Sequence, residues 1–167
     1  MDALETLFTR RSIRKYTDQP IADADVETML KAAMLAPSAN NRQPWQFIVV
    51  KQPEHLKAVA DMHPYGKMAA QAALAIVVCG TVAEPEYWIQ DCAAATENLM
   101  LAARALGIGS VWCGLHPLED RKTPFKEYFR IPEGVEPFAL IVLGYPAQPF
   151  SEAGTRVQPS RVHYEQW

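Results

Sequence analysis

The sequence predicts an α+β domain, in which a small sheet is covered by several helices. Segments with the apolar pattern of strands alternate with segments of helical pattern, yet few connections have the spacing of right-handed crossovers between parallel strands. About four strands are expected, which is a small sheet for this many helices. The 167 residues suit one well-formed core, and no repeat or linker divides them, so we expect a single domain over 1–167.

Two helices are expected in the first part of the chain. Asp2 and Glu5 form a capping-box-like start for a short helix that ends at a group of arginines. Asp23 is positioned to cap a second helix, whose apolar residues repeat at helical spacing until Pro37 stops it.

Two further helices and four strands complete the prediction. Gly107 is positioned as the left-handed cap of a long, mostly buried central helix. The helices are expected over 87–106 and 118–129, and the strands over 47–50, 72–79, 108–115 and 138–144.

The last segment, 145–167, is rich in proline and polar residues and carries a few aromatic side chains. We therefore expect it to lie extended over a surface. A fifth strand donated by a second chain would enlarge the small sheet, and this tail is the candidate for that strand. The sequence thus favours a homodimer.

The composition argues against several classes of protein. Hydrophobic residues make up 49% of the chain and the net charge is −3, which argues against a basic stripe that binds nucleic acid. The three cysteines have no CxxC spacing, so neither a disulfide framework nor a zinc site is predicted, and a cytoplasmic location is expected. The acidic N-terminus and the short apolar runs predict no targeting segment and no membrane partner.

Basic residues cluster in the stretch TRRSIRKY, directly after the first predicted helix. In irregular backbone, guanidinium groups, a hydroxyl and free amides can converge on one phosphate. The residues concerned are Arg10, Arg11, Ser12 and Arg14. The alternative interpretation is a solvated basic turn.

The loop APSANNRQPWQF supplies small residues and amides in place of charge. Pro37, Ser38 and Ala39 let the backbone approach a flat ligand closely. Asn41 and Gln43 offer paired donors and acceptors of the kind that bind a heteroaromatic edge. The alternative is an ordinary loop between a helix and a strand, in which these are turn residues.

The stretch GIGSVWCGLHP carries Trp112, Cys113 and Gly114 to the C-terminal end of a predicted strand, a common place for ligand contacts. Gly114 would admit a ring against the backbone. Cys113 lacks a histidine and an acid placed to activate it, so a small buried residue is the preferred interpretation. The four histidines show no metal-ligand spacing and are expected to be surface or packing residues.

Taken in order, these motifs resemble one family over almost the whole chain. RRSIRKY, APSANNRQPWQFIVV, a long helix ending in ALGIGSVWCG, then LIVLGYP and a late arginine resemble the short form of the flavin mononucleotide (FMN)-dependent nitroreductases. The resemblance implies a three-layer α/β/α fold with a mixed, mostly antiparallel sheet. It also implies an intertwined homodimer that holds FMN at its interface, with the tail 145–167 embracing the partner subunit.

The resemblance implies which residues would bind FMN. The phosphate, ribityl chain and ring edge would be contacted by Arg10, Arg11, Ser12 and Arg14, with Arg161 of the tail closing on the phosphate. The other subunit would contribute Pro37, Ser38, Ala39 and Asn41. The ring near N5 would be lined by Trp112, Cys113 and Gly114, and a family lysine near its pyrimidine end is matched, with imperfect spacing, by Lys67.

For function, the resemblance implies ping-pong transfer of hydride from NADH or NADPH through flavin N5 to an electron-poor nitroaromatic or quinone. No protein acid or base is obligatory, so no catalytic residue is predicted. Two alternatives stay open: a specialised flavin reaction such as reductive dehalogenation or flavin fragmentation, and a flavin-binding module without turnover.

Two departures from the family pattern have consequences. Residues 81–86 stand where longer members carry an inserted helical lid, which predicts an open active site. Pro159 stands where some relatives have a second basic residue, which leaves Arg161 alone on its side of the phosphate unless Arg156 compensates.

Overall fold

The fold is described from a computed structural model, which covers residues 1–82, 86–150 and 156–167. The helices are α1 (Ala3–Thr9), α2 (Asp23–Met34), α3 (Pro53–Met62), α4 (Trp88–Ala105) and α5 (Glu119–Phe129). The strands are β1 (Trp45–Val50), β2 (Leu74–Thr81), β3 (Gly109–Gly114) and β4 (Val135–Gly144). Three short 3-10 helices lie in the connections: η1 (Ala39–Asn41), η2 (Lys67–Gln71) and η3 (Pro159–Arg161).

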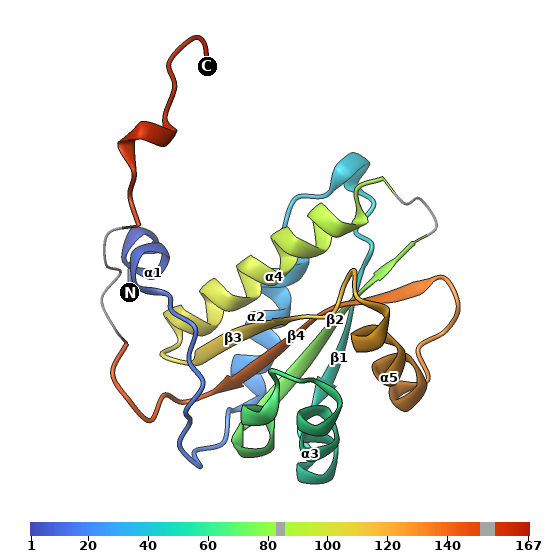
Figure 1. Cartoon of the computed structure of the whole chain (residues 1–167). Coiled ribbons are helices and arrows are strands. Elements are labelled where there is room, and N and C mark those ends of the chain that lie inside the picture. Colours follow the sequence, from blue (N-terminus) through green and yellow to red (C-terminus); the bar gives the residue numbers. More distant parts are fainter. Residues whose placement is uncertain (83–85, 151–155) are drawn as a thin grey trace.

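The sheet has the strand order β1-β2-β4-β3, and all three pairings are antiparallel. Helices α2 and α4 cover one face, and α3 and α5 cover the other (Figure 1). The predicted α+β class with three layers is therefore confirmed. Within the described ranges, the parallel component of the expected mixed sheet is a single bridge between Ser12 and Ser110.

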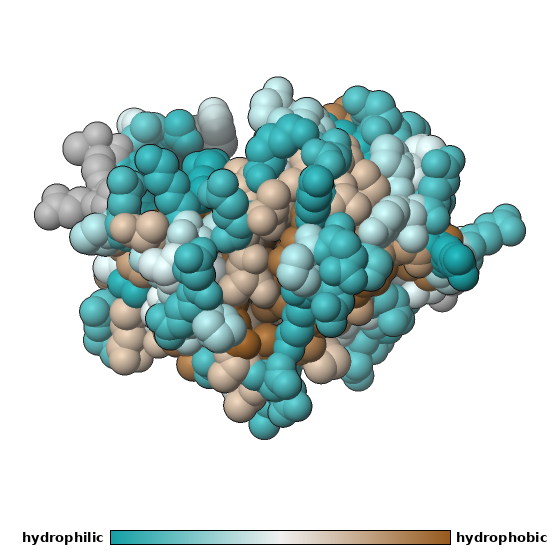
Figure 2. Space-filling view, turned by 90° about the horizontal axis from the view of Figure 1, so that it is seen from below, coloured by the Kyte–Doolittle hydropathy of each residue, from teal (hydrophilic) through white to brown (hydrophobic). Residues whose placement is uncertain are grey.

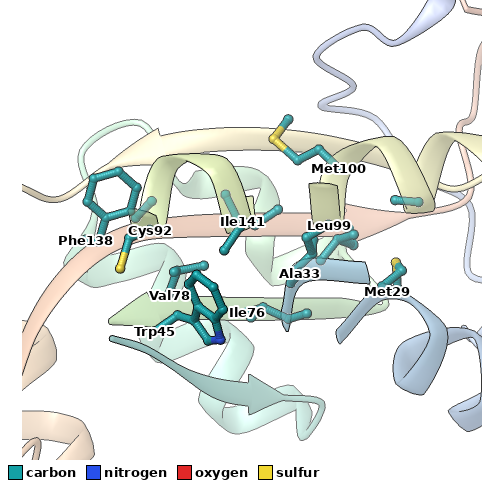
Figure 3. Packing of buried hydrophobic residues seen from close by; sticks show 14 of the residues in the cluster. Met29, Ala33, Trp45, Ile76, Val78, Cys92, Leu99, Met100, Phe138 and Ile141 are labelled. Atoms are coloured by element: carbon teal, nitrogen blue, oxygen red, sulfur yellow. The ribbon is translucent and has the colours of Figure 1, made fainter. Parts of the chain in front are cut away.

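Strand β2 divides the core between the two faces of the sheet. Its residues Leu74, Ile76 and Val78 pack in the cluster beneath α2 and α4, part of which is drawn in Figure 3. The intervening Val77 and Cys79 pack on the opposite side. Because neither face meets water, the strand is apolar at nearly every position instead of alternating.

Two predicted helix ends are confirmed and one is wrong. The Asp2 carboxylate accepts a hydrogen bond from the Glu5 amide at 2.8 Å, and Gly107 has a positive φ of 77° just after α4. Asp23, however, is the first residue of α2 and makes no side-chain cap. Its carboxylate instead forms an ion pair with Lys51, because the start of α2 lies beside the end of β1.

Helix α3 was not predicted. It begins with Pro53 in its first turn and buries Leu56, Val59 and Ala60, which repeat at helical spacing. The proline and the apolar spacing are visible in the sequence, but the helix has only ten residues, so the pattern is short. The helix matters here because it ends at the loop that approaches the end of β3.

One face of the surface and the helices were compared with what a membrane span requires. The face in Figure 2 is mostly hydrophilic, with apolar residues showing in a hollow near its centre. Among the described residues, no helix is long and apolar enough to cross a bilayer.

The tail leaves the domain. Its described part, 156–167, is exposed throughout and extends past α1 away from the sheet (Figure 1). Val157 is 88% exposed and Trp167 is fully exposed. Apolar side chains in such a position gain nothing from burial within their own chain, which favours a second molecule as their contact surface.

Replacing Glu136 with glutamine should destabilise the fold by about 2 kcal/mol, because it removes one of the two carboxylates that pair with the buried Lys122 ammonium group, the other being Glu119 at 2.6 Å. The Glu136 carboxylate accepts from Lys122 at 2.7 Å and from Lys126 at 2.6 Å, and the Lys122 side chain is only 6% exposed. Burial raises the pKa of Glu136, but the hydrogen bonds and charges of both lysines outweigh it, so the pKa lies below its ordinary value.

Urea unfolding across pH measures this effect. Because the folded pKa is depressed, the stabilisation is present above the unfolded pKa of about 4.5 and is lost as the pH falls through the folded pKa. The variant should lack this loss, and Glu133→Gln, an equal change at an exposed position nearby, should behave as the parent. An unchanged unfolding free energy at neutral pH in Glu136→Gln would refute the prediction.

Candidate functional site

The arginine-rich segment lies along the free edge of β3. The Ile13 amide donates to the Ser110 carbonyl at 2.9 Å, and further along the Thr17 amide donates to the Tyr145 carbonyl at 2.9 Å. Close approach requires glycine on the neighbouring strand: a Cβ at Gly109 would lie 2.8 Å from Ile13. The free edge of β3 is therefore covered by the arginine-rich segment that the sequence analysis identified.

The basic cluster divides into two parts. Arg10 forms an ion pair with Glu97 at 3.3 Å, and Arg11 is buried with its guanidinium on the carbonyls of Phe8 and Arg10 at the end of α1. Arg14 is exposed and lines a hollow of about 270 Å³ together with Ser12, Ile13, Lys15, Gln148 and Pro149. A hydroxyl and two cations around one hollow suit a small anion such as a phosphate.

The C-terminal end of β3 offers an open backbone surface. An atom added as Cβ on Gly114 would meet nothing within 4 Å, so a flat ligand has room to approach the main chain. Trp112 is half-buried, with its ring centroid 5.4 Å from that of Phe138. Trp112 packs in the cluster beneath α2 and α4, whereas Cys113 is buried in the cluster beneath α3 and α5, so the end of β3 is anchored on both faces of the sheet.

Cys113 is a buried thiol. Its Sγ donates to the Tyr65 carbonyl at 3.5 Å. Burial raises the pKa of Cys113, and the positive charges of Arg14 and Arg121 offset part of this rise. The thiol is therefore protonated at neutral pH, which supports the packing interpretation over a nucleophile. The guanidinium groups of Arg14 and Arg121 therefore both place positive charge near Cys113, at the end of β3.

Sequence reasoning missed three residues of this site. The Gly114 carbonyl accepts hydrogen bonds from His63 Nε2 at 3.0 Å and from Arg121 Nη1 at 3.2 Å. The Arg121 guanidinium also lies 5.4 Å from the centre of the Tyr65 ring. These residues come from the α3–η2 loop and from α5, and no spacing in the sequence indicates that both reach β3.

Lys67 lies at the start of η2, two residues beyond Tyr65. Its ammonium group is 3.6 Å from the Asp61 carboxylate, and both side chains are 68% exposed. An exposed pair of this kind contributes little to stability, so the lysine can turn toward a ligand at low cost.

The loop at 37–43 lies elsewhere. The Ala39 amide donates to the Asp91 carboxylate in the first turn of α4 at 3.0 Å, and Gln43 Nε2 donates to Asn41 Oδ1 at 2.7 Å. The other end of α4 contacts the N-terminal segment, since Arg104 donates to Thr9 at 3.0 Å. Arg104 is thirteen positions beyond Asp91, which corresponds to about 20 Å of helix. Figure 1 accordingly places the loop and the N-terminal segment at opposite ends of α4.

A single chain therefore brings together only part of the predicted site. Ser12 and Arg14 lie along the edge of β3, and Cys113 and Gly114 lie at its end, where the charge of Arg14 acts on Cys113. The loop residues do not reach this strand within one chain; they are Pro37, Ser38, Ala39 and Asn41. Arg161 lies in the exposed tail, in η3. The connection between β2 and α4, where longer members of the family carry a helical lid, consists of residues 82–87. Its residues 83–85 lie outside the described ranges.

The described part of the chain was also compared with the requirements of a metal site and of a disulfide. There, no group of three or more histidine, cysteine, aspartate or glutamate residues could hold a metal ion. Cys79, Cys92 and Cys113 are all buried free thiols. The geometry thus defines an α+β domain with a hollow lined by Ser12, Arg14 and Lys15 and an open backbone surface at Gly114.

Comparison with known proteins identifies the family. The sequence matches the Nitroreductase family over residues 7–76 and 58–145. The "Putative NADH dehydrogenase/NAD(P)H nitroreductase" of Archaeoglobus fulgidus is 49% identical over 172 residues, covering 99% of both chains. A solved structure of the same name from Bacteroides thetaiotaomicron has a TM-score of 0.95 at 38% identity, over 99% of this chain and 98% of that one. This chain belongs to the nitroreductase family.

A further solved structure concerns the cofactor. The "FMN-dependent Nitroreductase" of Clostridium difficile is 28% identical, with a TM-score of 0.93 over 98% of this chain and 99% of that one. The residues found here fit such a group: the hollow at Ser12 and Arg14 suits its phosphate, and the open backbone at Gly114 suits its ring.

Proposed function

We propose that this protein is an FMN-dependent NAD(P)H oxidoreductase that reduces nitroaromatics, quinones or similar electron-poor compounds. The observation that carries the proposal is that the Arg14 hollow lies along the edge of β3, that the open Gly114 backbone ends the same strand, and that the positive charge of Arg14 acts on Cys113, the neighbour of Gly114. A phosphate and a flat ring on one molecule would fill both at once. Relatives named NAD(P)H nitroreductase and FMN-dependent nitroreductase support the same assignment.

The cofactor site is proposed to be completed by a second subunit. Within one chain the amide-rich loop is held at Asp91, about 20 Å along α4 from the arginine segment. A homodimer would bring the loop of one subunit to the β3 edge of the other. The exposed apolar tail and the exposed Leu4, Leu7 and Phe8 of α1 supply surface for such a contact.

Each group of residues has a proposed task toward FMN. Ser12 and Arg14 hold the phosphate, and Arg161 of the tail closes on it. Trp112, Cys113 and Gly114 form the wall against which the ring lies. Lys67 and Arg121 place positive charge near that wall. Arg10 and Arg11, whose side chains engage Glu97 and the end of α1, fix the backbone of the segment.

When bound, FMN supplies the relay of hydride between NADH or NADPH and the electron-poor acceptor. The residues of this chain bind and orient the ring and leave one of its faces open. Fixed cations beside the ring favour negative charge there without reorganising, which is how such sites assist electron uptake. No side chain is assigned proton transfer, so we name no catalytic residue.

The visible absorbance spectrum of the purified protein tests the proposal. A yellow protein that releases about one FMN per chain on heating, and whose colour is bleached by NADH or NADPH, supports it. A yellow protein that nicotinamide does not bleach would be a flavin-binding module without turnover. A colourless protein that takes up no added FMN would refute the cofactor assignment.

Replacing Gly114 with valine should abolish FMN binding and leave the fold intact. An added Cβ meets no atom within 4 Å in the ligand-free chain, which leaves room for a side chain, so the free energy of unfolding should change by less than about 1 kcal/mol. The same side chain would occupy the space proposed for the ring. Flavin fluorescence titration and urea unfolding measure the two effects, and tight FMN binding by Gly114→Val would place the ring elsewhere.

A further inference from the structure

His63 is a buried histidine that makes two hydrogen bonds of opposite direction. It is fully buried at the C-terminal end of α3. Its Nε2 lies 3.0 Å from the Gly114 carbonyl oxygen, and its Nδ1 accepts from the Tyr65 amide at 3.1 Å. The first contact requires a proton on Nε2 and the second requires none on Nδ1. Only one neutral tautomer makes both.

The two bonds join a loop to the end of β3. The Gly66 amide donates to the His63 carbonyl at 3.0 Å, and a Cβ on Gly66 would lie 2.8 Å from that of His63, so the loop folds tightly around this residue. The hydrogen bond from Cys113 Sγ to the Tyr65 carbonyl is a second connection to the same strand. The loop leads directly into Lys67.

We propose that His63 is a positioning residue of the cofactor site. It holds loop 64–67 against the Gly114 carbonyl and thereby fixes both the open backbone of Gly114 and the position of Lys67. The inference rests on the proposed function, because the wall it fixes is the one assigned to the flavin ring. His63 would act through Gly114 and the loop, without contacting the flavin ring itself.

The surroundings of His63 determine its charge. Arg121 of α5 donates to the same carbonyl, Cys113 faces the loop from β3, and the Lys67–Asp61 pair lies on the solvent side. Burial first, and then the charge of Arg121, lower the pKa of His63, against the hydrogen bond to Gly114. The imidazole is thus neutral at pH 7. Protonation at lower pH removes the acceptor for the Tyr65 amide and should release the loop.

The test compares FMN dissociation constants of His63→Phe, His63→Gln and the parent, measured by flavin fluorescence. His63→Phe keeps a ring but loses both hydrogen bonds, and its affinity should fall roughly tenfold. His63→Gln keeps a donor for the Gly114 carbonyl and should lose less. His55→Phe is the matched control on the same helix, where His55 contacts the exposed Tyr128 hydroxyl, and it should bind FMN as the parent does.

Two further readouts separate positioning from a general loss of stability. Amide exchange should accelerate at 65–67 in His63→Phe while the strands stay protected. As the pH falls through the lowered pKa of His63, the parent should lose more affinity than His63→Gln. Comparing the two proteins at each pH removes the titration of the FMN phosphate, which both share.

Each outcome decides the matter. Parent-like FMN affinity in both His63 variants overturns this inference and leaves the proposed function standing. Failure of the parent to bind FMN overturns both. If His63→Phe does not fold, a parent-like affinity and pH profile in His63→Gln overturns the inference, and a weakened, flatter profile supports it.

Discussion

Replacing Arg14 with alanine is expected to weaken FMN binding by roughly 10- to 150-fold, the equivalent of one charge-assisted contact of about 1.5–3 kcal/mol. Arg14 is the arginine of the cluster that lines the hollow at the β3 edge, whereas Arg10 and Arg11 engage Glu97 and the end of α1. Its side chain is exposed, so the free energy of unfolding should hardly change. Fluorescence titration with FMN measures the loss.

Two matched variants sharpen this test. Lys57→Ala removes one positive charge from an exposed position on α3 and should leave FMN affinity unchanged. Riboflavin, which lacks the phosphate, should bind the parent and Arg14→Ala with similar affinity. If Arg14→Ala lowers riboflavin affinity as strongly as FMN affinity, Arg14 does not act on the phosphate.

Deleting residues 151–167 is expected to convert a dimer into monomers and to abolish FMN retention. The deletion is placed after Phe150 because earlier residues belong to the domain: the Ala147 amide donates to the Lys15 carbonyl at 3.0 Å, and Arg104 lies 3.9 Å from the Phe150 ring centroid. The removed tail includes Trp167, fully exposed in the single chain. Light scattering gives the mass, and the visible spectrum gives the flavin content.

Arg161→Ala distinguishes the two effects of the deletion. It keeps the apolar side chains of the tail, so it should remain dimeric and lose only part of its FMN affinity. A truncated protein that scatters light as a dimer would show that the tail does not hold the subunits together. A dimeric parent with a monomeric Arg161→Ala variant would assign the arginine to the interface.

Much of the fold could be predicted because it depends on local pattern. Strands β2 and β4 are buried on both faces, so their sequences are continuous apolar runs that a short inspection identifies. The Asp2 cap and the Gly107 terminator follow from backbone chemistry of single residues. Asp23 failed as a cap because a distant partner, Lys51, takes its carboxylate.

The site was predictable only as separate motifs. The segment at Arg14 and the strand end at Gly114 were both identified, yet their proximity depends on the order of strands in the sheet. His63 and Arg121 were not identified, because their role arises from one backbone carbonyl that both reach from different elements. Every residue has a backbone carbonyl, so the sequence does not indicate which carbonyl two distant side chains will contact.

The burial of β2 and β4 on both faces has a consequence for how this protein can diversify. A central strand with no side exposed to water tolerates few substitutions, since each position contributes to one of two packed layers. The candidate ligand residues, in contrast, lie on the rim, in the N-terminal segment, the α3–η2 loop, the end of β3 and the tail. Changes in specificity can therefore accumulate at the rim while the two inner strands keep the scaffold constant.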